Sequence, residues 1–218
     1  MARPDPVKRR SVVEERKSSL AFNRTVAFSD GVFAIAITLL VLSIEIPSDD
    51  TSNLGQRVLD LGPDLLSYFI GFAVIGMYWV AHHRFFDALE GFNQTMMMLN
   101  LLFLAFIALL PGPTALLGEH GGEPVSDIVY ALAVAAAGLT ETTMLVYARR
   151  VGLLRSEAHT EYATVIKRAL VAPVIFLASI PVAVLVPEHA PWMWLGIAFA
   201  ARRFRDAPVV AQPAAPPK

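Results

Sequence analysis

Apolar residues fill long segments of the chain, and short polar stretches separate these segments. Six are apparent, at residues 25–46, 65–81, 95–117, 128–148, 169–186 and 190–201. A helix of about 20 apolar residues crosses the hydrocarbon core of a bilayer, and helices satisfy their own backbone hydrogen bonds there. The pattern therefore predicts an all-α polytopic membrane protein with six transmembrane helices. The last segment is short, because its 12 residues rise only about 18 Å across a core about 30 Å thick.

Composition supports a membrane protein. Hydrophobic residues make up 55% of the 218 residues and charged residues 17%, which is more apolar than a soluble domain of this size requires. Cysteine is absent, which excludes disulfides and thiolate metal sites. The basic residues between Arg3 and Lys17 precede an apolar segment that is longer than a signal-peptide core and has no small-residue cleavage motif. We expect this first segment to be retained as a span.

The distribution of Lys and Arg predicts the orientation of the chain. With six spans, 17 of the 18 Lys and Arg residues, all but Arg57, flank the spans on one side. The positive-inside rule assigns that side to the cytoplasm, so both termini are predicted to be cytoplasmic in a multi-pass protein of the cell membrane. We predict a disordered N-terminus at 1–19, a six-helix domain at 20–205 and a disordered Pro/Ala-rich tail at 206–218.

The first span carries a narrow aliphatic stripe. At about 100° per residue, Leu39 and Leu42 fall within about 40° of Ile35 around the helix, and Thr38 lies at the border of this stripe. In lipid every helix surface is apolar, so the stripe is open to interpretation as ordinary packing. The other interpretation is a pore lining in which large aliphatic side chains form a hydrophobic constriction.

Two ionisable residues, Arg24 and Asp30, also lie in this first apolar segment. Charged groups within a membrane are costly unless they are paired or hydrated. Asp30 points away from the stripe, which indicates a structural anchor. On the second span Trp79, His82 and His83 share one face at i, i+3, i+4 spacing. Their ring N–H groups are suited to satisfy a buried carboxylate.

Two further polar residues lie within later spans. Asn100 in the third span is typical of a residue that links helices by hydrogen bonds. Glu141 in the fourth span is the kind of acid that a proton-coupled carrier requires, although it is equally suited to an aqueous crevice or to pairing with nearby threonines. Adjacent histidines diverge by about 100° on a helix, and no further ligands accompany them. We predict no metal site, cofactor, nucleic-acid partner or enzymatic activity.

Several motifs resemble a known family. Arg24-x-x-x-Phe28-Ser29-Asp30 at the start of the first span, the G-V-F-A-I-A-I-T-L-L-V-L run after it, W-V-A-H-H-R from Trp79, and L-N-L-L-F-L-A-F-I-A-L-L-P-G-P-T from Leu99 are similar to prokaryotic members of the transmembrane protein 175 family. The likeness covers about the first half of the chain. The later spans resemble that family only in topology.

The resemblance implies a potassium-selective channel with passive flux, built without a T-V-G-Y-G filter. A chain with a single F-S-D motif resembles the homotetrameric members, in which the first helix of each subunit lines the pore and K+ is the permeant ion. Ile35, Leu39 and Leu42 would match the constriction rings, and Thr38 a hydroxyl layer that contributes to selectivity. A structural network would comprise Arg24, Phe28, Ser29, Asp30, Trp79, His82 and Asn100.

Two alternatives remain open at this point. The first is a proton-coupled secondary transporter that uses Glu141 and the histidines, which predicts inverted repeats and broken helices at matching positions. The second is a membrane scaffold or assembly subunit without flux of its own.

Overall fold

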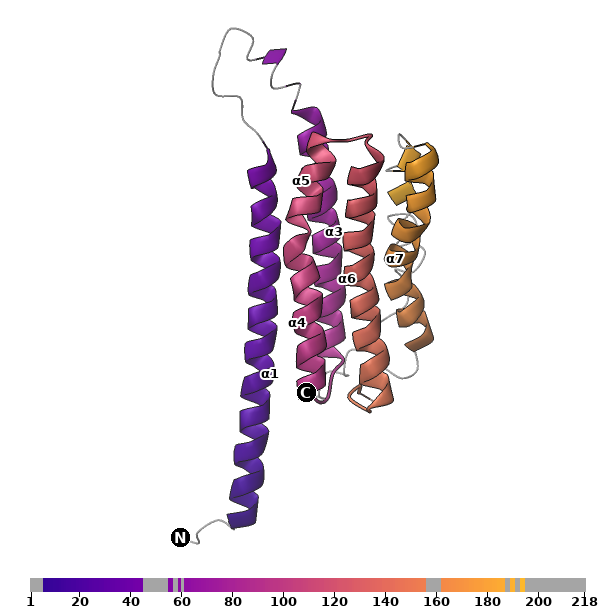
Figure 1. Ribbon diagram of the computed structural model, residues 1–218. Helices are drawn as coiled ribbons and strands as arrows, with labels where there is room; N and C mark the ends of the chain where they lie inside the picture. The colour runs from indigo at the N-terminus through magenta and orange to yellow at the C-terminus, as the bar shows by residue number, and fades with distance from the viewer. Residues whose placement is uncertain are drawn as a thin grey trace, which may run out of the picture.

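The chain forms a bundle of long helices (Figure 1). A computed structural model describes residues 6–44, 61–155 and 162–186, together with 55–56, 59, 189–190 and 193–194. No strand occurs in these ranges beyond one isolated bridge between Leu89 and Leu154. The elements are α1 (Pro6–Leu39), a 3₁₀ turn η1 (Leu40–Ser43), α3 (Gly62–Asp87), α4 (Gln94–Leu109), α5 (Pro111–Glu119), α6 (Pro124–Arg150) and α7 (Tyr162–Leu185).

Five stretches of helix are long and apolar enough to cross a membrane: Leu20–Ser43, Gly62–Asp87, Gln94–Glu119, Pro124–Arg150 and Tyr162–Leu185. They overlap the first five predicted segments, with ends that differ from the predicted ones by up to seven residues. The all-α, multi-pass class is therefore confirmed. The sixth predicted segment, at 190–201, lies almost entirely outside the described residues, as does the tail at 206–218.

Helix α1 starts earlier than the prediction placed it. We predicted no regular structure at 1–19, whereas the helix already begins at Pro6 and continues without interruption into the first span. Proline is favourable in the first turn of a helix, and the Lys, Arg and Glu residues that follow have high helix propensity. The polarity of this stretch excludes it from the membrane, but it does not prevent helix formation.

Proline and asparagine set several of the helix boundaries. Pro111 interrupts the third span, so that α4 ends at Leu109 and α5 begins at Pro111. A proline lacks the N–H that would continue the hydrogen-bond ladder. Asn93 caps the start of α4, because its Oδ1 accepts a 2.9 Å hydrogen bond from the backbone N–H of Met96. Its Nδ2 donates to the hydroxyl of Tyr147 at 3.0 Å and thereby ties the start of α4 to α6.

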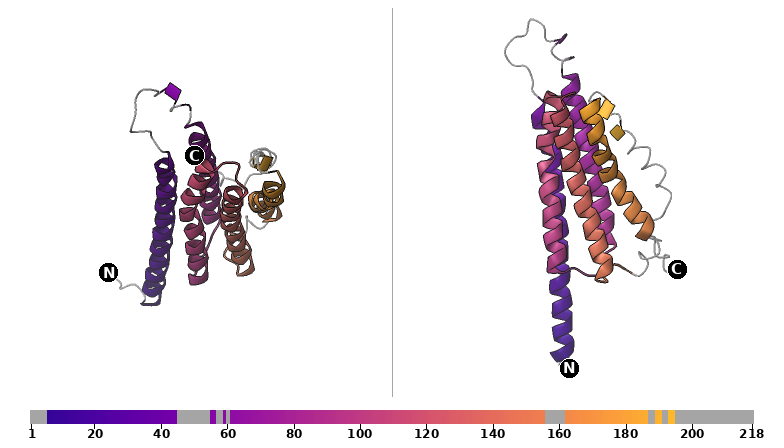
Figure 2. Two further views of the ribbon diagram at one scale, coloured as in Figure 1. Left: turned by 45° about the horizontal axis from the view of Figure 1, so that its top comes forward. Right: turned by 45° about the vertical axis from the view of Figure 1, so that its right-hand side comes forward.

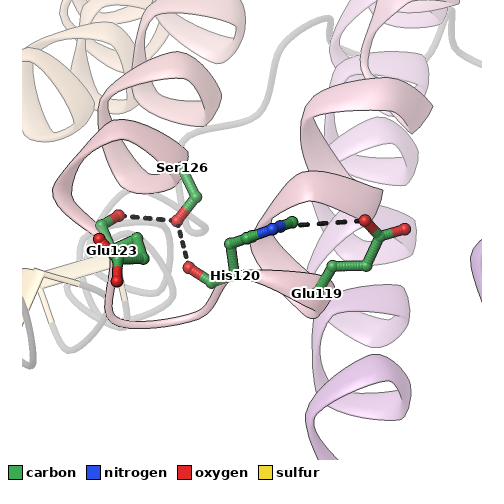
Figure 3. A network of polar contacts seen from close by, with 4 residues as sticks. All are labelled: Glu119, His120, Glu123 and Ser126. Atoms are coloured by element: carbon green, nitrogen blue, oxygen red, sulfur yellow. Dashed lines mark hydrogen bonds and ion pairs between the residues drawn. The ribbon is translucent and has the colours of Figure 1, made fainter.

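A polar turn joins α5 to α6 at the other end of the bundle (Figure 3). The buried hydroxyl of Ser126 has two backbone acceptors, the carbonyl oxygens of His120 at 2.7 Å and Glu123 at 2.8 Å. The exposed side chains of Glu119 and His120 lie 3.9 Å apart. This turn therefore depends on one buried serine, and its charged groups face outward.

Helix α6 is the most buried span, and α1 lies at the edge of the subunit. In the views of Figures 1 and 2, α1 stands at one side of the bundle, α7 at the other, and α3 to α6 lie between them. Of the most apolar window of each span, 61% is buried in α6 but only 22% in α1. The face of α1 that packs on α3 and α4 comprises Ser29, Phe33, Ala36 and Leu40. Phe22, Val26, Val32 and Ile37 flank this face and are partly buried, whereas Phe28, Ile35 and Leu42 on the opposite side are exposed among the described residues.

Candidate functional site

The aliphatic stripe of α1 lies on its free surface. Ile35 is 61% exposed, Leu39 42% and Leu42 74%, and Thr38 is exposed beside them. Phe33, Ala36 and Leu40 on the packed face are at most 1% exposed. The centres of the two sets lie more than about 90° apart around the helix at 100° per residue. The stripe is therefore directed away from the core of its own subunit.

Thr38 adds oxygen to this surface. Its hydroxyl donates a 2.9 Å hydrogen bond to the carbonyl of Ile35, one turn earlier. A hydroxyl that donates its proton to the backbone still has lone pairs that can accept a hydrogen bond or approach a cation. Thr38 can therefore present an oxygen atom at the exposed stripe without leaving its donor unsatisfied.

The end of the first span has a tighter geometry than the sequence predicted. Leu40–Ser43 form a 3₁₀ turn, in which residues advance by about 120° and rise about 2.0 Å each. The wheel position predicted for Leu42 assumed an α-helix and does not apply here. Leu42 is nevertheless the most exposed residue of the stripe.

A chain of hydrogen bonds joins α1 to α4 and α3 on the packed face. The Ser29 hydroxyl donates to the carbonyl of Thr25 at 2.9 Å, the Asn100 Nδ2 donates to Ser29 Oγ at 3.0 Å, and the His82 Nε2 donates to Asn100 Oδ1 at 2.8 Å. Ser29, Asn100 and His82 are each at most 2% exposed. Each buried group is satisfied by the next, and the chain ends on a backbone carbonyl.

Aromatic rings enclose the imidazole at the end of this chain. The ring of His82 stacks on Phe86 with centroids 4.2 Å apart and on Phe103 at 5.5 Å. Phe33 of α1 lies against both His82 and Phe103. The apolar surroundings strengthen the hydrogen bonds and exclude competing water. These phenylalanines could not be identified from the sequence, because nothing in a membrane sequence distinguishes a buried Phe from one that faces lipid.

Asp30 belongs to a separate pair. The indole Nε1 of Trp79 donates to Asp30 Oδ1 at 2.9 Å, so Trp79 is a partner of the carboxylate, as the spacing predicted. The histidine prediction differs from the structure, because His82 binds Asn100 and not Asp30. His83 lies on the exposed side of α3, with its ring stacked on Trp79 and its Nε2 3.7 Å from Asp87.

Arg24 and Phe28 lie apart from the network to which we assigned them. Arg24 is exposed and has no hydrogen bond or ion pair with the described part of the chain, and Phe28 is 55% exposed. At 100° per residue both fall within about 20° of Ile35. They therefore extend the exposed stripe toward the start of the span. The positions of Arg24 and Phe28 on the helical wheel were enough to predict that they lie on the same face as Ile35.

Glu141 is buried in α6, away from the α1 stripe. Its side chain is 4% exposed, and no described residue forms a hydrogen bond or ion pair with it. Among the described residues, His82 is hydrogen-bonded to Asn100 and His83 lies near Asp87, and neither histidine is bonded to Glu141. No group of three or more potential metal ligands of the His, Cys, Asp or Glu type occurs in the described ranges.

The fold and this arrangement define a multi-pass α-helical membrane protein. The family model described as "Endosomal/lysosomal potassium channel TMEM175" matches residues 24–111. A potassium channel of Streptomyces collinus is 39% identical over 155 residues, which cover 67% of this chain and 75% of that protein. The mouse endosomal/lysosomal proton channel TMEM175 is 40% identical over 101 residues, which cover 42% of this chain and 20% of the mouse protein.

A solved structure agrees with these relatives. The crystal structure of a lysosomal potassium-selective channel TMEM175 homolog from Chamaesiphon minutus has a TM-score of 0.75 and 30% identity, and the match covers 86% of this chain and 99% of that one. The chain belongs to the TMEM175 family. The family match begins at Arg24 and includes the stripe, Trp79, His82 and Asn100. Glu141 lies outside it.

We predict that Asn100→Leu destabilises the subunit. The substitution keeps the branched shape of the side chain but leaves His82 without an acceptor and Ser29 without a donor, which costs about 1–3 kcal/mol of unfolding free energy for buried groups. Thermal unfolding of the purified protein in detergent measures the change. Met98→Ala is the control, because Met98 lies on the exposed side of the same helix at 54% exposure. Equal melting temperatures for wild type and Asn100→Leu would contradict the role of this chain of hydrogen bonds.

Proposed function

We propose that this chain is the subunit of a homotetrameric, potassium-permeable channel in the cell membrane, with both termini in the cytoplasm. The exposed stripe of α1 lines the pore. The observation that best supports the proposal is that α1 has two distinct faces. One face is fixed to α3 and α4 by buried hydrogen bonds, and the other presents Ile35, Thr38, Leu39 and Leu42 outward. Membership of a family with members named potassium channels supports potassium as the permeant ion.

The position of α1 favours a pore between subunits. Core residues from all five described spans pack against one another, so the interior of one subunit is filled by side chains. Edge helix α1 has little buried surface. An ion path lined by α1 requires further copies of the chain around a shared axis. Four copies, as the family resemblance implies, would each contribute one stripe.

The composition of the α1 surface favours water and ions over lipid. Lipid-facing helix surfaces are apolar, whereas polar and ionisable residues in spans face a bundle interior or a hydrated cavity. The exposed face that carries Ile35 also includes Arg24 and Thr38. A guanidinium and a hydroxyl on this face are suited to a pore that is hydrated at its mouth and narrow along its aliphatic part.

The proposed mechanism is passive. Rings of Ile35, Leu39 and Leu42 exclude water when they are close together and admit it when α1 tilts or rotates slightly, because a hydrophobic constriction gates by dewetting. Thr38 oxygens would replace part of the hydration of an ion at the level between two aliphatic rings. Flux then follows the electrochemical gradient of the ion.

The two alternative functions have less support. A proton-coupled transporter would connect Glu141 with the histidines, yet His82 is bound to Asn100 and Glu141 has no bond to either histidine in the described ranges. A scaffold without flux would not need a hydroxyl beside an aliphatic ring. Potassium flux into liposomes with and without a proton gradient separates all three functions.

We predict that Leu39→Ala raises the single-channel potassium current several-fold. The substitution removes the bulk of one ring and makes the constriction wider and easier to hydrate. Planar-bilayer recording of the reconstituted protein measures the current. Leu102→Ala is the matched control, since Leu102 is a similarly exposed leucine, at 49%, on α4. An unchanged current in Leu39→Ala, or an equal rise in Leu102→Ala, would refute a constriction at this residue.

We predict that Thr38→Val lowers the potassium-to-sodium permeability ratio, whereas Thr38→Ser preserves it. Valine has the shape of threonine without the hydroxyl, and the loss of one oxygen contact of about 1 kcal/mol corresponds to about a fivefold change. Reversal potentials under bi-ionic conditions measure the ratio. If both variants keep the wild-type ratio, selectivity does not depend on this hydroxyl.

We predict that the purified protein has the mass of four chains in native mass spectrometry. The chain contains no cysteine, so Leu42→Cys introduces its only thiol, at a position that four subunits would bring together around the axis. Mild oxidation should convert this variant to disulfide-linked dimers on a denaturing gel, and Leu102→Cys should remain monomeric. A monomer mass, together with equal cross-linking of both variants, would exclude the assembly.

A further inference from the structure

Glu141 is an ionisable group that the pore proposal does not use. It lies in α6, the most buried span, and is 4% exposed without a hydrogen bond or ion pair to any described residue. An ionised carboxylate with so little access to water and no counter-charge among the described residues carries a severe energetic penalty. The group is therefore either neutral or bound to a cation.

Three helices meet around this residue. Gly138, one turn before Glu141, brings α6 so close to its neighbours that an added Cβ would lie 2.7 Å from the Tyr78 hydroxyl and 2.9 Å from Cδ of Pro173. Tyr78 of α3 is buried and donates its hydroxyl proton to the carbonyl of Val134 at 2.8 Å. Tyr78 and Glu141 lie close enough for electrostatic interaction. Glu141 thus belongs to a tight junction of α3, α6 and α7.

Pro173 supplies an unsatisfied acceptor near this junction. A proline within a helix deprives the carbonyl four residues earlier of its donor, and in α7 that carbonyl belongs to Ala169. Gly138 of α6 lies against Pro173 of α7, and the two helices are antiparallel. Moving three residues forward along α6, from Gly138 to Glu141, therefore leads in the same direction as moving four residues back along α7, from Pro173 to Ala169. Ala169 is therefore at about the level of Glu141.

The hydroxyl groups of α6 near Glu141 already donate to the backbone. Thr142 donates to the carbonyl of Gly138, and Thr140 to that of Ala136, both at 2.8 Å. A bare metal cation requires about six oxygen ligands, and the described residues contain no group of three or more potential His, Cys, Asp or Glu ligands. A proton, by contrast, binds to the carboxylate itself, and the resulting O–H group needs only one hydrogen-bond acceptor. The donor set therefore fits a proton better than a metal ion.

We propose that Glu141 is a proton-binding site within each subunit, separate from the α1 surface. The carboxylate takes up one proton to form a neutral carboxylic acid, and the new O–H donates to the backbone carbonyl that Pro173 leaves free on α7. Release of the proton leaves an unpaired charge between α6 and α7 and weakens their packing.

Charged and titratable groups on the neighbouring helices bear on this equilibrium. Tyr78 is the titratable group of α3 at the junction, and α4 contains no titratable residue along Gln94–Leu109. The charged residue of α5, Glu119, is at the far end of the bundle in the turn of Figure 3. On α7, Lys167 and Arg168 directly precede Ala169. Arg168 has two buried nitrogens, Nε and Nη2, without hydrogen-bond partners, and it forms no ion pair with Glu141 among the described residues.

Infrared spectroscopy of the full chain in liposomes tests the proposal. At neutral pH the exposed carboxyl groups are ionised, and a neutral carboxylic acid gives a separate C=O stretching band. We expect this band in the wild type, its loss in Glu141→Gln, and its persistence in Asp127→Asn, where Asp127 is the other carboxyl of α6 with buried, unpartnered oxygens. Incorporation of isotope-labelled glutamate into the wild type should shift the band, which requires no variant to fold.

The pH dependence of the melting temperature is a second test of the proposal. An unfolded glutamate releases its proton above its ordinary pKa of about 4.3, whereas the folded wild type retains it. The melting temperature should therefore fall as the pH rises from about 5 through neutral, and it should level off once the folded protein has also released the proton. Glu141→Gln should lose this dependence, and Asp127→Asn should retain it. A wild-type spectrum without a glutamate-dependent band, or a band that appears only when potassium is removed, would overturn the proposal. Potassium flux through the α1 pore is measured independently, so failure of either proposal leaves the other testable.

Discussion

The buried hydrogen-bond chain from His82 through Asn100 to Ser29 fixes the orientation of α1, and the outward surface of the subunit depends on it. Two helices in lipid gain little from hydrophobic association, so polar contacts and close packing decide which faces meet. The three side chains come from three different spans and end on the carbonyl of Thr25. With this face fixed, Ile35, Leu39 and Leu42 are left on the exposed surface of α1.

Much of this arrangement could be predicted from the sequence, because the relevant rules act over one or two turns of helix. Span lengths follow from runs of apolar residues, and the separation of Asp30 from the stripe follows from helical periodicity. The partner of Asp30 followed from the spacing of Trp79. The partner of His82 did not, because a polar side chain among several buried donors and acceptors chooses by distances that only the packed helices determine. Asn100, on a third helix, provided the nearer acceptor.

Other features depend on information that periodicity does not contain. The start of α1 at Pro6 reflects the helix propensity of charged residues, which a search for apolar runs ignores. The 3₁₀ turn after Leu39 reflects local backbone geometry near Ser43, whose hydroxyl donates to the carbonyl of Leu40 at 2.8 Å. Arg24 and Phe28 were assigned by motif to the buried network, although their helical positions place them with Ile35. A motif identifies residues that matter together, whereas the helical wheel identifies the face on which each one lies.

Two acidic residues within the spans, Asp30 and Glu141, have different environments. Asp30 is half-buried near the start of the first span and accepts a hydrogen bond from an indole, so its charge is compatible with hydration from the nearby end of the bundle. Glu141 is 4% exposed and has no hydrogen-bond donor among the described residues, and our proposal pairs it with the carbonyl that Pro173 deprives of its helical donor. A carboxylic acid supplies that donor, and a carboxylate does not. Pro173 of α7 and Glu141 of α6 therefore complement each other in our proposal. The carbonyl that Pro173 leaves free is an acceptor without a donor, and the neutral acid of Glu141 is a donor without another acceptor.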